Sequence, residues 1–130
     1  MNDEFKVEIV NPEKSFLSKE DATEVVVPAF EGEMGILKDH ISIISFLKPG
    51  IITTYFKSGE EKFYVEDGIV EFKDNILSIL TSSIINLKEM EKTKVQDLIS
   101  AAEKDTSKPD ISDQSKYILD QKIEVLRNLN

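Results

Sequence analysis

The spacing of apolar residues changes abruptly near Leu87, and this change constrains the fold more than any other feature of the sequence. From Phe5 to about Leu80, apolar and polar residues alternate in short segments that are rich in β-branched and aromatic side chains. Segments such as EVVVP, IITTYF, KFYVE and NILSIL are separated by turn formers, for example at residues 57–60. Short strands at this spacing favour an antiparallel sandwich or barrel over a parallel sheet with crossover helices.

After Leu87 the apolar residues recur every three to four positions, which is typical of amphipathic helices. Residues 105–112, which include Pro109, interrupt this pattern, and Ser112 or Asp113 is suited to cap a second helix. The stripe of the first helix is expected at Leu87, Met90 or Glu91, Lys94 or Val95, Leu98 and Ala102, and that of the second at Ile118 or Leu119, Ile123, Leu126 and Leu129.

The two periods predict a fold of the β plus α class. An N-terminal antiparallel β-sandwich is expected over residues 1–87, followed by a C-terminal two-helix hairpin over residues 88–130. Each helix is short enough to be marginal by itself in water. The two helices must therefore be stabilised by each other, by the sandwich or by another protein, and the hairpin is the part of the chain most suited to move.

Acidic residues are concentrated in the first part of the chain. The formal net charge is −9 at pH 7, and residues 1–87 hold 16 Asp and Glu against 8 Lys. Residues 88–130 are nearly balanced, with 9 acidic and 8 basic side chains. Binding to a phosphate backbone needs a basic face, so nucleic acid is excluded as a partner. A basic protein surface is the better complement, although the charge also serves solubility.

Composition excludes several further classes. The chain has no Cys, and therefore no disulfide framework, thiolate nucleophile or Cys-based zinc site. No apolar run approaches the roughly 18 residues that a membrane span needs. The start, MNDEFKVEIV, lacks the basic and apolar regions of a secretory signal, so the chain is expected to stay where it is made.

Few residues are suited to catalysis. His40 is the only histidine, which leaves no Ser-His or zinc constellation. Paired carboxylates, as at Glu31 and Glu33, are expected by chance among 25 acidic residues. The spacing Gly32-x-x-Gly35 is too short for a dinucleotide fingerprint and lacks the Lys and Ser or Thr of a P-loop. We therefore expect no catalytic residue and no metal site.

One segment, EGEMGILKDHISIISFLKPGII at residues 31–52, has a specific pattern. It reads Gly-Glu-apolar-Gly-apolar, then a short turn and His, then an apolar stretch that ends in Lys-Pro-Gly. The residues that carry this pattern are Gly32, Glu33, Met34, Gly35, His40, Lys48, Pro49 and Gly50. The pattern closely resembles the signature of the ATP synthase epsilon subunit family. The resemblance takes in FKVEIVNPEKSFLS, GIVEF and NILSIL, and it weakens after Leu87.

The resemblance implies a β-sandwich of about ten strands followed by a two-helix hairpin. It implies a non-catalytic subunit of the central stalk of a proton-translocating rotary ATP synthase, whose sandwich holds the gamma subunit and rests on the c-subunit ring. Such a subunit lies at the cytoplasmic side of the bacterial inner membrane, peripherally and without inserting. The foot on the ring maps to Gly32, Glu33 and Met34, with His40 in the same contact region. Residues expected mostly in the core are Ile41, Ile43, Ile44, Phe46 and Leu47.

The resemblance also implies that the hairpin regulates or inhibits ATP hydrolysis by reaching the alpha and beta subunits of the catalytic head. Some bacterial members bind ATP at the hairpin through a motif that resembles apolar-Asp-x-x-Arg-Ala, assisted by arginines on the second helix. Here Glu91 and Lys94 replace the Asp and the Arg, and Arg127 is the only arginine. Lysine lacks the planar guanidinium that grips phosphate with two hydrogen bonds. The motif is degraded, and no bound cofactor is expected.

Two other functions are compatible with the residues alone. A free-standing sandwich that binds a peptide or a carbohydrate would use the hairpin as a dimerisation clip. A small acid-base enzyme would centre on His40 and nearby carboxylates. Co-purification with a large membrane-associated complex would favour the stalk subunit over both, and an activity screen with a His40→Ala control would test the enzyme.

Overall fold

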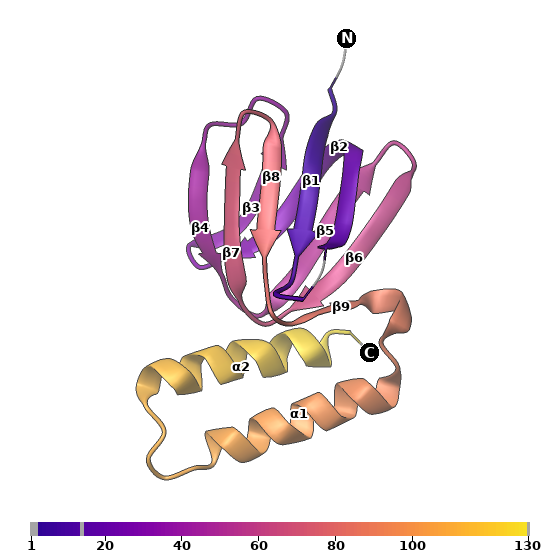
Figure 1. The fold of residues 1–130 in the computed structure, drawn as a ribbon. Helices are drawn as coiled ribbons and strands as arrows, with labels where there is room; N and C mark the ends of the chain where they lie inside the picture. The colour runs from indigo at the N-terminus through magenta and orange to yellow at the C-terminus, as the bar shows by residue number, and fades with distance from the viewer. Residues whose placement is uncertain (1–2, 14, 130) are drawn as a thin grey trace.

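The computed structural model describes residues 3–13 and 15–129, in which a strand-rich part precedes two helices (Figure 1). The strands are β1 (Phe5–Val10), β2 (Ser15–Ala29), β3 (Gly32–Leu37), β4 (Ile43–Leu47), β5 (Gly50–Phe56), β6 (Gly59–Val65), β7 (Gly68–Lys73), β8 (Ile76–Leu80) and β9 (Ile84–Asn86). A short 3-10 helix, Leu87–Glu89, leads into α1 (Lys92–Thr106) and α2 (Asp113–Arg127).

The long strand β2 belongs to both layers of the sandwich. Its first half pairs with β1, and its second half pairs with β3 and β5. The first layer has the order β1, β8, β7, β4, and the second has β3, β2, β5, β6, β9. A register shift follows Ala22 in the pairing with β5, and another lies opposite it in β1. Such irregularities bend a strand, and here they let β2 pass from one layer to the other.

Alternating side chains fill the space between the layers. On β7, for example, Val70 and Phe72 are buried, whereas Ile69, Glu71 and Lys73 are exposed. The core is one cluster that consists of Phe5, Val7, Ile9, Ala22, Val25, Val27, Ile36, Leu47, Ile52, Phe56, Phe63, Val65, Val70, Phe72, Leu77 and Ile79. A core of this size gives the sandwich its own source of stability.

The hairpin lies across one end of the sandwich, with α2 next to the strands and α1 beyond it (Figure 1). The Ser112 hydroxyl caps α2 by accepting a hydrogen bond from the Ser115 N–H at 3.1 Å. A second apolar cluster, formed by Tyr64, Val95, Ile99 and Leu126, joins the helices to the sandwich. Because successive side chains of a strand point to opposite faces, Tyr64 of β6 faces the hairpin while its neighbours face the core.

The predicted fold class is confirmed, with differences in detail. The described residues form nine strands where about ten were expected, and β1 pairs with β8 in parallel, so the sandwich is not purely antiparallel. The first helix starts at Lys92, after a 3-10 turn, and it buries Ile99 rather than Leu98 between Val95 and Ala102. No helix in the described part of the chain is long and apolar enough to cross a membrane.

Candidate partner-binding surfaces and the hairpin contact

The turn between β2 and β3 presents Glu33 to solvent. Gly32 has a φ of +138°, a backbone conformation that residues with a Cβ rarely adopt, and it lies opposite Ala29 in the pairing of the two strands. Glu33 follows directly and is exposed. It lines a shallow hollow with Lys48 and with the C-terminal end of α2. The glycine therefore serves the turn, and the carboxylate is available to a partner.

The Lys-Pro-Gly segment supports this turn from the neighbouring strands. The Lys48 N–H donates a hydrogen bond to the Pro28 carbonyl at 3.0 Å. A Cβ built on Gly50 would lie 2.5 Å from the Pro28 Cβ, so a larger residue at position 50 requires the backbone to move. Gly50 thus has a packing role, which explains its place in the sequence pattern.

Met34 and His40 do not share one surface with Glu33. Met34 is partly buried and packs against the core cluster. His40 lies beyond the other end of β3, where its ring packs edge-on against Phe72 with the ring centroids 6.0 Å apart. The adjacent Asp39 is hydrogen-bonded to Asn75 in the turn between β7 and β8. Glu33 and His40 therefore lie at opposite ends of β3, and their shared contact with a partner stays a prediction.

The apolar run of β4 is not mostly core, contrary to expectation. Leu47 is buried and Ile43 is half-buried, but Ile44 is 71% exposed and Phe46 is 63% exposed, and Ile41, before the strand, is exposed as well. The buried Ser45 sits between the exposed pair and donates a hydrogen bond to the Glu31 carboxylate at 2.9 Å. The strand alternates normally, and its outward face is as apolar as its inward one.

The outward apolar side chains line up across the whole first layer. Phe46 is paired with Ile69, Ile69 with Leu80, and Leu80 with Val10, so that these four exposed residues form a row across β4, β7, β8 and β1. We call Val10, Leu80, Ile69 and Phe46 the outer row. The exposed Phe30, in the β2–β3 turn, lies next to the outer row, because its N–H donates a hydrogen bond to the Phe46 carbonyl. Sequence reasoning missed this surface, although the doubly apolar strand ISIISFL was a signal for it.

A hollow of about 570 Å³ lies where the outer row meets the hairpin. It is lined mainly by apolar side chains, among them Phe30, Phe46, Ile69, Leu80 and Ile118 of α2. Contiguous exposed apolar surface with a polar rim is typical of protein–protein contact sites. The outward face of the first layer is therefore suited to a protein partner.

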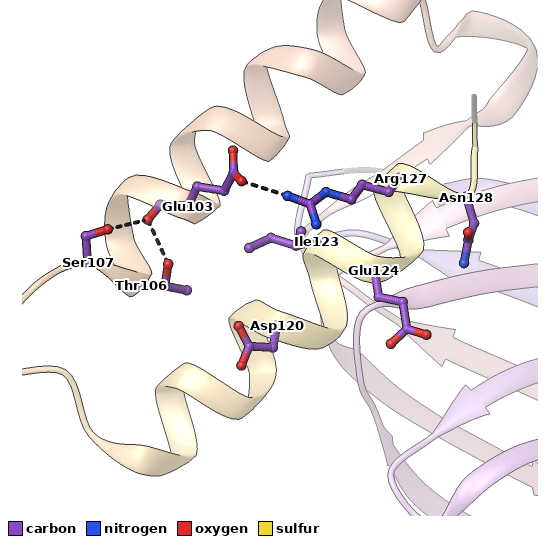
Figure 2. Close-up of a pocket in the computed structure, with 8 residues that line it drawn as sticks. All are labelled: Glu103, Thr106, Ser107, Asp120, Ile123, Glu124, Arg127 and Asn128. Atoms are coloured by element: carbon purple, nitrogen blue, oxygen red, sulfur yellow. Dashed lines mark hydrogen bonds and ion pairs between the residues drawn. The ribbon is translucent and has the colours of Figure 1, made fainter.

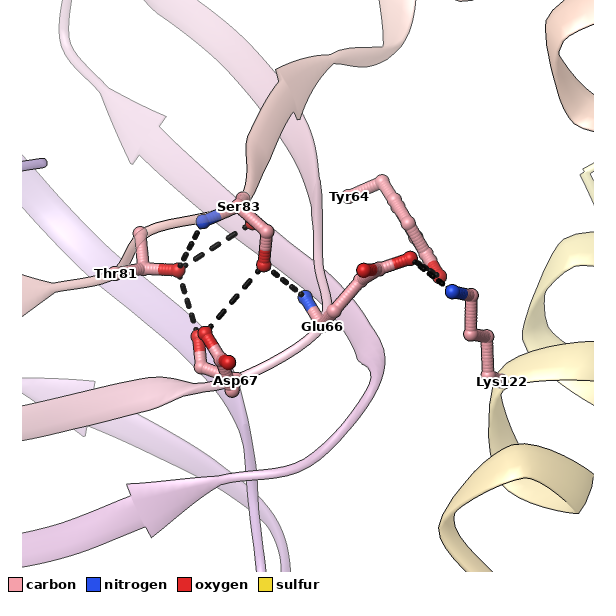
Figure 3. Close-up of polar contacts among 6 residues, drawn as sticks. All are labelled: Tyr64, Glu66, Asp67, Thr81, Ser83 and Lys122. Carbon is pink, nitrogen blue, oxygen red and sulfur yellow. Dashed lines mark hydrogen bonds and ion pairs between the residues drawn. The ribbon is translucent and has the colours of Figure 1, made fainter. Parts of the chain in front are cut away.

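The hairpin is also held to the sandwich by a polar network around Glu66, a residue that lines the same hollow (Figure 3). The Lys122 ammonium lies 2.6 Å from a Glu66 carboxylate oxygen, and the Tyr64 hydroxyl donates to the same oxygen at 3.1 Å. Burial and the adjacent Glu66 charge raise the pKa of Tyr64, so its hydroxyl stays protonated and remains a donor. The network connects β6, the segment after it and α2.

The residues of the degraded nucleotide motif do not converge. Glu91 precedes α1 as its N-cap and makes no side-chain capping hydrogen bond. Lys94 lines a hollow beside Tyr64 and Glu66. The Arg127 guanidinium is instead directed at Glu103 of α1, 2.7 Å away, in an acidic hollow between the helices (Figure 2). The described residues contain no group of three or more His, Cys, Asp or Glu placed to hold a metal ion.

Comparison with protein families gives a match over residues 4–87 to the β-sandwich domain of the ATP synthase delta/epsilon chain. An ATP synthase epsilon chain of Pelagibacter ubique is 70% identical over 130 residues, which is the full length of both chains. An ATP synthase epsilon chain of Agrobacterium fabrum is 37% identical over 103 residues, covering 78% of this chain and 75% of that one.

Two solved structures share the fold. A chain from the mitochondrial ATP synthase of Euglena gracilis, in a structure of OSCP, F1 and the c-ring, matches with a TM-score of 0.77 at 20% identity, over 97% of this chain and 79% of that one. A chain from the central stalk and c-ring of the Tetrahymena thermophila enzyme matches with a TM-score of 0.72 at 17% identity, over 95% and 93%. Together with the full-length relative, the family match shows that the chain belongs to the ATP synthase epsilon chain family.

Proposed function

We propose that this chain is a non-catalytic rotor subunit of a proton-translocating ATP synthase that links the gamma subunit to the c-subunit ring. The full-length relative is named an ATP synthase epsilon chain, and the solved structures of like fold come from assemblies of F1, the central stalk and the c-ring. Its place is then peripheral, at the cytoplasmic side of the bacterial inner membrane. It transmits torque and makes no bonds itself.

The outer row is the proposed contact with the gamma subunit, and it is the observation that carries the proposal. The two outward faces of the sandwich differ: that of β5 and β6 is covered at Tyr64 by the hairpin, whereas the outer row is uncovered. A rotor subunit has to remain attached to the shaft under torque, and a broad apolar face contributes most to such a contact. The acidic surroundings of the sandwich complement basic groups on the partner.

The Glu33 turn is the proposed foot on the c ring. It presents an exposed carboxylate on a turn whose geometry is fixed by Gly32 and by the close packing of Gly50 on Pro28. It lies next to Phe30, and therefore next to the end of the outer row. In this proposal the Glu33 turn and the outer row form one continuous surface that makes both rotor contacts. His40, beyond the other end of β3, is not part of that surface.

The hairpin, residues 88–130, is proposed to regulate ATP hydrolysis by leaving the sandwich and reaching the alpha and beta subunits of the head. The sandwich, residues 1–87, has a complete core without it, and the hairpin is attached through the small second cluster and the Glu66 network. Two arrangements that differ by only a few kcal/mol can be switched by modest changes in binding.

Cross-linking in assembled enzyme tests the two rotor contacts separately. The chain has no Cys, so single cysteines at Phe46 and at Glu33 report without background. The Phe46→Cys chain is expected to cross-link to the gamma subunit, and the Glu33→Cys chain to a c subunit. Ser58→Cys, in the exposed turn between β5 and β6 at the end away from the hairpin, is the control and is expected to give neither product (Figure 1). Cross-linking of Phe46→Cys to a second copy of this chain instead would favour the dimeric binding module.

A further inference from the structure

Glu66 occupies a fixed position on the sandwich side of the hairpin contact. Its N–H donates to the Ser83 hydroxyl at 3.2 Å, and the next residue, Asp67, accepts through its carbonyl from the Thr81 hydroxyl at 2.7 Å (Figure 3). Two connections, from β6 to β7 and from β8 to β9, are tied together in this way. The Glu66 carboxylate is therefore placed by the sandwich and not by the hairpin.

Lys122 meets this carboxylate from the hairpin side in a partly desolvated position. Its side chain is 18% exposed and that of Glu66 is 30% exposed. By contrast, the pair of Arg127 with Glu103 joins the two helices to each other, and its side chains are 61% and 50% exposed. Solvent and salt weaken an exposed pair far more than a partly buried one. The two pairs thus differ both in strength and in what they hold together.

Tyr64 connects the ion pair to the apolar contact. Its ring is buried in the second cluster with Val95, Ile99 and Leu126, and its hydroxyl donates to the carboxylate oxygen that Lys122 also contacts. Removal of the hairpin would expose the ring and leave the carboxylate without the lysine at the same time. The apolar contact and the ion pair that dock the hairpin are therefore coupled at Tyr64.

We propose that Lys122 and Glu66, positioned by Tyr64, form a latch that sets the fraction of molecules with the hairpin docked. This proposal rests on the proposed regulatory role of the hairpin and names the groups that control it. Loss of either charge leaves the other partly buried and unpaired, which favours release. The Arg127–Glu103 pair moves with the hairpin and does not contribute to the latch.

The test uses the full chain with spin labels on Ser58→Cys and Asp110→Cys, two exposed sites on the sandwich and on the loop of the hairpin. Distance distributions are recorded at a urea concentration that releases about a tenth of the parent hairpins. Glu66→Gln and Lys122→Met are each expected to raise the ratio of released to docked molecules by about three- to tenfold. The exchanged pair, Glu66→Lys with Lys122→Glu, is expected to return the ratio toward the parent value. Glu103→Gln is the matched control and should leave it unchanged.

A parent-like ratio in both single variants would overturn the latch. So would an exchanged pair whose ratio stays as high as those of the single variants, because restoring opposite charges at the two positions would then fail to restore docking. The regulatory role is read separately, as ATP hydrolysis by the assembled complex. A variant that releases its hairpin but leaves hydrolysis unchanged would overturn the proposed regulation while supporting the latch.

Discussion

The sandwich and the hairpin differ in how their apolar residues are used. The sandwich closes a core of 16 buried residues between its layers, whereas the cluster that docks the hairpin has four, one of them from the sandwich itself. A large closed core resists local opening, and a small contact opens first. One sequence thus combines a rigid body with an attached part that is held by a few groups.

The largest expected effect is on the rigid part. Phe72 is buried and meets Phe5 edge-on with the ring centroids 5.6 Å apart. Phe72→Ala should lower the free energy of unfolding by about 3–5 kcal/mol, since it removes the ring and leaves a cavity. Urea unfolding measures this loss. Phe46→Ala is the matched control, because its ring lies on the outer face, and it should change the same quantity by less than about 0.5 kcal/mol.

A chain that stops after Leu87 tests whether the sandwich is stable without the hairpin. It loses the hairpin but keeps the whole core, so the sandwich should still fold, with unfolding free energy lower by about 1–2 kcal/mol from the exposure of Tyr64. In membranes that carry this chain, ATP hydrolysis should rise while proton-driven synthesis survives. Unchanged hydrolysis would make the hairpin a structural brace, and an unfolded product would show that the domain boundary is misplaced.

A smaller effect is expected at the cap of α2. Ser112→Ala removes the hydroxyl that accepts from the Ser115 N–H and should destabilise the hairpin by about 1 kcal/mol. Circular dichroism should show an earlier loss of helix, with the unfolding of the sandwich unchanged. Ser100→Ala, at an exposed position inside α1, is the control and should be neutral or slightly stabilising. Equal shifts in both transitions would mean that the two parts unfold as one.

The smallest effect is expected from ATP. Two basic residues of α2, Lys122 and Arg127, are already paired with Glu66 and Glu103, and they point to different places. Titration calorimetry of the isolated chain should therefore show no saturable binding at physiological concentrations. Tight binding would require both pairs to break and would contradict this account of the hairpin.

The sequence was sufficient for the two periods, the helix breaker around Pro109, the family and a cap of the second helix at Ser112 or Asp113. Those features are local, and a single segment shows them. It was not sufficient for the parallel pairing of β1 with β8 or for the meeting of Lys122 with Glu66, because these join residues far apart in the chain. It also misassigned Ile44 and Phe46 to the core, since a strand that is apolar on both faces does not show which face meets the core.

The pairing of β1 with β8 has a consequence for the order of assembly. Lys6 pairs with Ile76, so the first strand has no neighbour in parallel register until nearly the whole sandwich has been synthesised. Contacts of such long sequence separation slow folding, because the loop between them must close first. The outer row draws Val10 and Leu80 from these two strands. A nascent or misfolded chain therefore lacks the complete row, and only a finished sandwich presents it to a partner.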